Sequence, residues 1–135
     1  MSYLLGTNVI SELRKRQPNE RVAAWYDTVT APELFISALT IGEIRLGVER
    51  LRRKDRTQAE RLEQWLYGLQ ATYEDHIVSV DADVADEWAR LNVPDPLPTV
   101  DSLLAASAKA RGWTLVTRNT ADFARCGVRL LDPFA

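Results

Sequence analysis

The sequence contains one histidine and one cysteine, and this scarcity excludes several kinds of site. A single His76 rules out nucleases that use a histidine pair for acid–base chemistry, and zinc centres built on several His or Cys ligands. Cys126 has no partner for an internal disulfide. We expect both residues to be structural, with Cys126 a small, semi-buried apolar residue and His76 placed just before a strand.

Long hydrophobic runs are also absent. No apolar stretch approaches the roughly 18 residues that span a bilayer, and no basic segment followed by an apolar stretch opens the chain. The 135 residues, 46% of them hydrophobic and 27% charged, are typical of a globular domain. We therefore expect a single domain over residues 1–135, a cytoplasmic location and no membrane partner.

Positive charge is not in excess overall, but it is unevenly distributed. A net charge of -2 argues against a protein that coats nucleic acid uniformly. Two segments are nevertheless rich in cations: Arg14, Lys15, Arg16 and Arg21 in the first, and Arg45, Arg50, Arg52, Arg53, Lys54, Arg56 and Arg61 in the second. Two interpretations stay open: solvated helix faces interspersed with Glu49, Glu60 and Glu63, or a rim that binds phosphates.

Short apolar segments typical of buried strands recur five times, and most are separated by helical patterns. The expected strands are 3–6, 34–37, 77–80, 114–117 and 128–131. The expected helices are 8–14, 20–28, 39–51, 58–73, 81–92 and 100–111, with Thr99 as an N-cap and Gly112 closing the last helix. Strands alternating with helices predict an α/β domain with a parallel five-stranded sheet and helices on both faces.

Acidic residues follow this pattern in a way that brings them together. Ligands of open α/β sheets bind at the carboxyl ends of the strands, where the next helices begin. Position 6 ends the first strand, Glu43 lies early in the helix after the second, Asp101 begins the helix before the fourth, and Asp122 follows the fourth. We expect these three acids and Gly6 to converge on one edge of the sheet.

Each acid also has a purely structural explanation. Thr40 and Glu43 fit a capping box, in which the glutamate would bond the backbone of Thr40. Asp101 in a first helical turn complements the helix dipole, and Asp122, three residues after Asn119, fits a capped turn. Jointly, however, clustered carboxylates predict a bound Mg²⁺ or Mn²⁺, because they repel one another without a cation. Two such ions can drive phosphodiester hydrolysis without histidine, so the pattern indicates a metal-dependent nuclease.

Four segments in this order and spacing resemble the PIN-domain ribonucleases, and within them the VapC-type toxins of type II toxin–antitoxin pairs. They are YLLGTNVISEL at 3–13, ISALTIGEIRLGVERL at 36–51, TVDSLLAASAKARGWTLVTRNTADF at 99–123 and GVRLLDPF at 127–134. The resemblance implies a PIN domain with a Mg²⁺ or Mn²⁺ site, endonucleolytic cleavage of RNA and homodimerisation. It also implies a small antitoxin whose C-terminal segment lies near the active site.

The resemblance also implies roles for particular residues. Glu43 and Asp101 match two metal-site acids of the family motif, and Asp122 matches a more variable fourth acid. Thr7 and Asn119 match polar positions that help arrange the site. The first acid of the motif falls on Gly6. We expect that the turn does not demand glycine there, that a metal ligand has been lost, and that cleavage by this chain is severely impaired.

Other functions remain to be weighed against this one. The main alternative is a catalytically inactive PIN-like module that binds an antitoxin or RNA without cleaving it. A phosphoacceptor receiver domain would have Asp81 after the third strand as its phosphoacceptor, but the acidic residues after the first strand and the lysine after the fifth are missing. Neither G-x-G-x-x-G nor the P-loop motif occurs. Candidate antitoxin or dimer contacts, with burial in the core as the alternative, are Trp25, Tyr26, Leu46, Leu51, Trp65 and Leu66.

Overall fold

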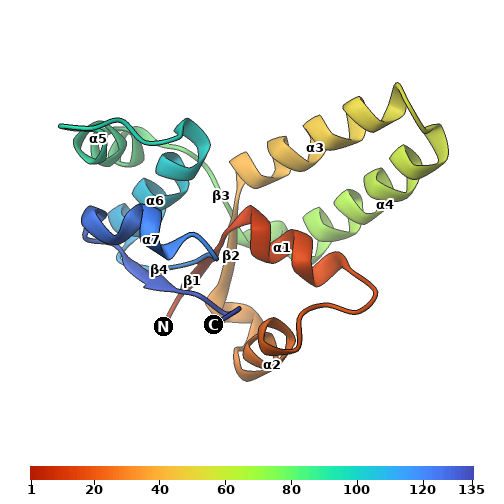
Figure 1. Ribbon diagram of the computed structural model, residues 1–135, viewed down its shortest axis with the longest axis horizontal. Helices are drawn as coiled ribbons and strands as arrows, with labels where there is room; N and C mark the ends of the chain where they lie inside the picture. Colours follow the sequence, from red (N-terminus) through yellow and green to blue (C-terminus); the bar gives the residue numbers. More distant parts are fainter.

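A five-stranded parallel sheet forms the centre of the molecule in the computed structural model, which describes residues 1–135 (Figure 1). The strands are β1 (Tyr3–Leu5), β2 (Leu34–Ser37), β3 (Ile77–Val78), β4 (Thr114–Val116) and β5 (Arg129–Leu131). Their order across the sheet is β3-β2-β1-β4-β5, and every neighbouring pair is parallel. The predicted α/β architecture is confirmed, although four of the strands begin or end a residue or two inside the predicted bounds.

Seven α-helices connect or flank these strands. They are α1 (Thr7–Arg14), α2 (Glu20–Thr28), α3 (Ala38–Arg52), α4 (Arg56–Thr72), α5 (Ala82–Leu91), α6 (Thr99–Arg111) and α7 (Thr120–Phe123). Three single turns of 3-10 helix, Ala31–Glu33, Glu74–His76 and Ala124–Cys126, complete the connections. Membrane-spanning helices are absent from the structure. The sequence pattern predicted the first six helices and missed the short α7.

Two hydrophobic cores lie on opposite faces of the sheet, because successive strand residues point to opposite sides. Leu4 belongs to the core that packs under α5 and α6, whereas its neighbour Leu5 belongs to the core beneath α1, α2 and α4. Leu115 and Val116 on β4 divide in the same way. This arrangement confirms the prediction of helices on both faces.

The structural roles expected for the rare residues are confirmed. Cys126 is buried in the core under α6. His76 lies just before β3, where its Nδ1 is 2.7 Å from the carbonyl oxygen of Leu34 and its ring stacks on Phe35. Leu66, proposed above as a candidate partner contact, is fully buried in the core beneath α1, α2 and α4. It is therefore a core residue, because its side chain faces the sheet rather than solvent.

Helices α3 and α4 form an antiparallel hairpin that projects away from the sheet (Figure 1). Two arginines of α3 pair with a single glutamate of α4. Glu63 on α4 accepts hydrogen bonds from Arg45 at 2.5 Å and from Arg52 at 2.8 Å, both on α3. These bonds lower the pKa of the Glu63 carboxyl below its usual range. The interpretation of the second basic segment as helix faces interspersed with glutamates is thus confirmed for Arg45 and Arg52.

Candidate functional site

The sheet has a topological switch point between β1 and β4. The chain leaves β1 toward β2 on one side and reaches β4 on the other, so a crevice forms where these two adjacent strands end. A cavity of about 320 Å³ opens there. Its walls are formed by Gly6, Thr7, Asn8, Ser11, Glu43, Asp101, Leu104, Leu115, Thr117, Asn119 and Phe123.

Glu43 enters this cavity from the second turn of α3 and is held by a hydroxyl from α1. Thr7 Oγ1 donates a hydrogen bond of 2.6 Å to Glu43 Oε1. Thr7 Oγ1 also lies 3.0 Å from Thr40 Oγ1, and since its own proton goes to Glu43, the buried Thr40 hydroxyl is the donor in this pair. The threonines therefore fix one carboxylate oxygen and leave the other free.

The capping box expected for Thr40 and Glu43 is not formed. Helix α3 begins two residues before Thr40, at Ala38, and its N-cap is Ser37, whose side chain accepts from the backbone N–H of Leu39. Likewise α6 begins at Thr99 with Pro98 as its N-cap residue, so Thr99 is not the cap. The Glu43 side chain is consequently free to face the cavity rather than the helix end.

A second set of polar contacts orders the opposite wall. Asn8 Nδ2 donates to Thr117 Oγ1 at 3.2 Å, and the backbone N–H of Asn119 donates to the same oxygen at 3.1 Å. The side chain of Asn119 makes no capping bond to α7, so the capped turn expected around Asn119 and Asp122 is absent. The sequence pattern did not single out Thr117 or Asn8 as site residues. Thr117 directly follows β4 and Asn8 lies beside Gly6, and these two positions are the signal that could have identified them.

Asp101 and Asp122 occupy different environments. Asp101 lies in the first turn of α6, half-buried, and lines the cavity with Glu43. Burial, and secondarily the nearby Asp122 carboxylate, raise the pKa of Asp101. Asp122 is exposed on α7 and is not part of the cavity wall. Of the residues predicted for the site, Gly6, Thr7, Glu43, Asp101 and Asn119 are brought together, and Asp122 stands outside at electrostatic range.

Gly6 sits at the base of this cavity, between β1 and α1. Its backbone angles, φ -67° and ψ 155°, are open to any amino acid, as expected from the sequence. Its N–H donates to the Val116 carbonyl at 2.8 Å, however, and a Cβ atom added at Gly6 would lie 2.9 Å from that same oxygen. The conformation does not demand glycine, but the close approach of β4 does disfavour a larger residue.

The cavity fits one hydrated divalent ion better than two. No three His, Cys, Asp or Glu side chains lie close enough together to hold a metal. Glu43 and Asp101 provide two carboxylates in a wall otherwise rich in hydroxyl and amide oxygens. Mg²⁺ is commonly held by one or two carboxylates and keeps several water ligands. The two-ion arrangement considered from the sequence lacks enough carboxylates inside this cavity.

In metal-free protein, Asp101→Asn is expected to raise the free energy of unfolding at neutral pH. Because the folded-state pKa of Asp101 is raised, the stability it contributes is complete below the ordinary pKa of about 3.9 and is lost as the pH rises through the folded value. Asparagine stays neutral and avoids that loss. Urea unfolding in EDTA should show a gain near pH 7 that vanishes near pH 3, and an equal gain at both would contradict this account.

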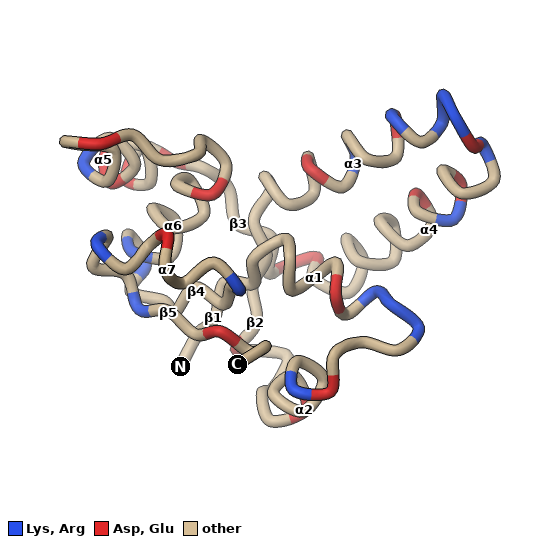
Figure 2. Tube along the Cα trace, viewed as in Figure 1, with Lys and Arg blue, Asp and Glu red and all other residues tan.

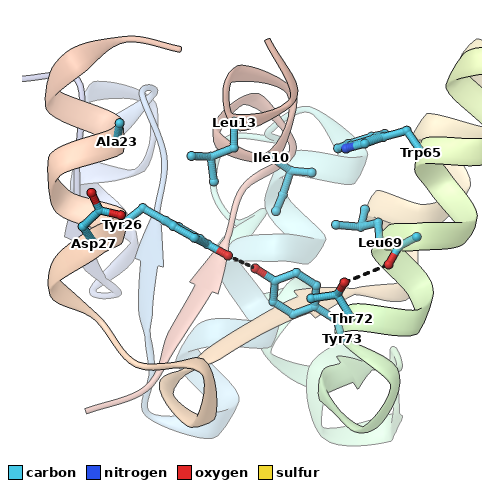
Figure 3. A pocket seen from close by; sticks show the side chains of 10 residues that line it. Ile10, Leu13, Ala23, Tyr26, Asp27, Trp65, Leu69, Thr72 and Tyr73 are labelled. Atoms are coloured by element: carbon cyan, nitrogen blue, oxygen red, sulfur yellow. Dashed lines mark hydrogen bonds between the residues drawn. The ribbon is translucent and has the colours of Figure 1, made fainter. Parts of the chain in front are cut away.

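A second, larger cavity of about 530 Å³ lies between α1, α2 and α4 (Figure 3). Its lining is mainly apolar: Ile10 and Leu13 from α1, Ala23 and Tyr26 from α2, and Trp65 and Leu69 from α4. The hydroxyls of Tyr26 and Tyr73 meet at its base, 2.9 Å apart. The cavity is separate from the carboxylate site, since the two have no lining residue in common.

Comparison with known proteins places this geometry in a family. The family model described as PIN domain matches residues 3–128. The chain is 36% identical to the toxin FitB of Neisseria gonorrhoeae over 97% of both chains, and 32% identical to the VapC ribonuclease Y4jK of Sinorhizobium fredii over 97% of this chain and 96% of that one.

A solved structure agrees with these sequence matches. The crystal structure of FitAcB from Neisseria gonorrhoeae aligns with a TM-score of 0.82 and 35% identity over 98% of both chains. The model match extends over most of the chain, and both relatives cover nearly all of it. The chain therefore belongs to the PIN-domain family, among its VapC-type toxins.

Proposed function

We propose that this protein is an endoribonuclease toxin that hydrolyses RNA phosphodiester bonds with the help of Mg²⁺ or Mn²⁺. The observation that carries the proposal is the pair of carboxylates, Glu43 and Asp101, facing one oxygen-lined cavity at the switch point of the sheet. PIN-domain ribonucleases generally depend on divalent metal ions, and one relative of this chain is a VapC ribonuclease. An RNA substrate would place the protein in the cytoplasm.

Glu43 and Asp101 would hold the metal, which when bound supplies positive charge to the scissile phosphate and activates water. The bond from Thr7 keeps Glu43 Oε1 oriented, so that the second oxygen can act as a ligand. Asp122 lies close enough to influence Asp101 through its charge, and Asn119 can donate to a phosphate oxygen from the opposite wall. Each of these roles is that of a ligand or positioning residue.

Gly6 leaves this set of ligands incomplete. A carboxylate at position 6 would emerge between Thr117 and Asn8, beside Glu43 and Asp101 in the same cavity. With glycine there, water must fill the coordination position. We propose that this chain consequently retains metal binding but cleaves slowly, since transition-state charge is stabilised through the metal.

The test is an RNA cleavage assay with the chain as it stands and with its Gly6→Asp variant, in Mg²⁺, Mn²⁺ or EDTA. We expect cleavage that is strong only in the variant, that EDTA abolishes, and that a further Glu43→Gln change removes. Fragment ends identify the cleaved bonds.

A non-catalytic binding module is the second candidate, and the absence of any three-carboxylate cluster favours it. Such a module would bind RNA or an antitoxin without metal-dependent cleavage. Slow cleavage by the unmodified chain in Mn²⁺ would identify an impaired enzyme. No cleavage by either form, with metal-independent RNA binding, would identify the module.

We further propose that an antitoxin occupies the apolar cavity between α1, α2 and α4. Similar solved structures include a toxin–antitoxin complex from Klebsiella pneumoniae and a member of the VapBC family of toxin–antitoxin systems from Mycobacterium tuberculosis. Trp65 and Tyr26, considered from the sequence as partner contacts, line this cavity, and so would meet an apolar segment of the antitoxin. Leu46, half-exposed on α3, and Leu51 and Trp25 remain candidates for homodimer contacts.

A pair of neighbouring alanines on α2 tests the antitoxin site. Ala23→Arg fills the cavity without removing a core side chain, whereas Ala24 is exposed and lies outside the cavity. Co-purification of the co-encoded partner should fail with Ala23→Arg and persist with Ala24→Arg. Equal retention by both variants would show that the antitoxin binds elsewhere.

A further inference from the structure

The tip of the α3–α4 hairpin carries a group of cations that form no ion pair with any acid of the protein. Figure 2 shows these residues at the end that projects farthest from the sheet. Arg50, Arg53, Lys54 and Arg56 are all exposed, and none of them forms an ion pair. Of the nearby carboxylates, Glu49 and Glu63 pair with Arg45 and Arg52, and Glu60, one helical turn after Arg56 on α4, forms no ion pair with it.

The one acid at the tip is engaged in folding as well. Asp55 is the N-cap of α4 and accepts a hydrogen bond of 3.1 Å from the backbone N–H of Gln58. This cap fixes the turn between the two helices. The carboxylate of Asp55 also interacts with the positive end of the α4 dipole, which partly neutralises its charge. The turn between the two helices therefore presents four unpaired cations beside one acid, with Glu60 one helical turn further along α4.

Helix electrostatics explains only some of these cations. Arg50 lies in the last turn of α3 and Arg53 is its C-cap, where positive charge is favourable. Arg56 is the first residue of α4, where the positive end of the helix dipole disfavours a cation, and Lys54 belongs to neither helix. Neither Lys54 nor Arg56 forms an ion pair within the protein, so both charges are available to an external anion.

The same helix that ends at this tip begins at the carboxylate site. Arg53 follows Glu43 by ten residues, which corresponds to about 15 Å along α3. A strand with one phosphate at Glu43 can therefore reach the tip only after several further nucleotides. A short ligand would occupy the carboxylate site alone, and a longer one would contact both.

We propose that the α3–α4 tip, through Arg50, Arg53, Lys54 and Arg56, binds the phosphate backbone of RNA that extends beyond the carboxylate site. The inference rests on the proposed RNA substrate, but it concerns binding and not cleavage. Contacts of this kind are made by lysine and arginine to phosphates, carry no base specificity and weaken as salt rises. The tip would therefore favour longer RNA over shorter RNA, whatever the base sequence.

The test measures RNA binding by the unmodified chain in Mg²⁺, so that the carboxylate site can hold the metal that attracts phosphate, within a time over which gel electrophoresis shows the RNA to be intact. The double variant Lys54→Gln/Arg56→Gln is compared with Arg21→Gln/Arg90→Gln, which removes the same charge from α2 and α5. Arg21 also lies in the first turn of a helix, which matches Arg56. Circular dichroism and urea unfolding should show all three proteins equally folded.

We expect the tip variant to bind an RNA of about twelve nucleotides roughly tenfold more weakly, with the slope of log K against log salt smaller by about 1.4. The control variant should bind as the unmodified chain does, and a trinucleotide should bind all three alike. Equal weakening by both variants, or weakening for the trinucleotide too, would overturn the proposal.

Two further outcomes distinguish this proposal from an acidic-polypeptide site and from the proposed nuclease function. If polyglutamate competes as well as RNA and loses affinity for the tip variant equally, the surface serves an acidic polypeptide and the RNA assignment is wrong. If tip-dependent RNA binding is found while the Gly6→Asp variant never cleaves RNA, the binding surface stands and the proposed nuclease function fails.

Discussion

Gly6→Asp is expected to increase metal-dependent RNA cleavage by about 100- to 1,000-fold. The added carboxylate would join Glu43 and Asp101 in the cavity and complete a third ligand position. Loss of one group that stabilises transition-state charge typically costs a factor of this size. Initial rates of cleavage at equal protein and Mg²⁺ concentrations measure the change.

The substitution also carries a steric cost that must be separated from its chemistry. A Cβ atom at position 6 lies 2.9 Å from the Val116 carbonyl oxygen, so β1 and β4 must move slightly apart. Overpacking of this kind costs about 1–3 kcal/mol, partly offset by the lower entropy of the unfolded chain without glycine. Gly6→Ala reports this cost alone, and we expect it to be less stable than the unmodified chain but no more active.

Gly6→Asn supplies the second control, since it has the shape of aspartate without the charge. Activity in Gly6→Asn equal to that of Gly6→Asp would show that the carboxylate is not what was missing. Full activity of the unmodified chain would contradict the impairment itself.

A binding readout independent of cleavage accompanies this prediction. Three carboxylates around the cavity repel one another without a cation, so Mg²⁺ should stabilise Gly6→Asp more than the unmodified chain. A metal at 100 times its dissociation constant adds about 2.7 kcal/mol to the free energy of unfolding. Thermal unfolding with and without Mg²⁺ measures this difference, and equal shifts in both proteins would count against a ligand at position 6.

Leu66→Ala is expected to lower the free energy of unfolding by about 2–5 kcal/mol. Leu66 is fully buried between α4 and the sheet, in the core that also holds Leu5, Val9 and Ile36. Its truncation removes buried apolar surface and leaves a cavity that the surrounding strands and helices can fill only in part. Urea unfolding followed by circular dichroism measures the loss.

Leu46→Ala is the matched control on the facing helix of the same hairpin. The Leu46 side chain is 49% exposed, so its truncation should change the free energy of unfolding by about 0.5 kcal/mol or less. Alanine also has the best helix propensity, which works in its favour on α3. A Leu46→Ala loss as large as that of Leu66→Ala would mean that the hairpin is buried in an assembly.

Much of the site could be predicted because it depends on topology. Strands separated by helices are parallel, and their carboxyl ends meet at one edge with the helix N-termini. This rule brought Glu43 of α3 and Asp101 of α6 to the position after β1, where Gly6 lies. Chain order and strand pattern were sufficient for that step, because the prediction needed only the helix turn on which each carboxylate lies, not the position of its side chain.

The details of the site depended on side chains from elements far apart in the sequence. Thr40 and Glu43 have the spacing of a capping box, yet Glu43 bonds instead to Thr7, 36 residues away. Local spacing favoured the cap, whereas the start of α3 at Ala38 and the approach of α1 decided the outcome. Asp122 similarly follows β4 as predicted but lies outside the cavity, because the short α7 turns it toward solvent.

The sequence by itself determined the α/β class, the order of the elements and the convergence of Glu43 and Asp101, since these follow from periodic patterns and parallel topology. Only the tertiary structure decided that Leu66 is core, that Val116 crowds Gly6, that an apolar cavity lies between α1, α2 and α4, and that the tip cations are unpaired. These features arise from packing between distant segments, and packing depends on side-chain positions that no local pattern encodes.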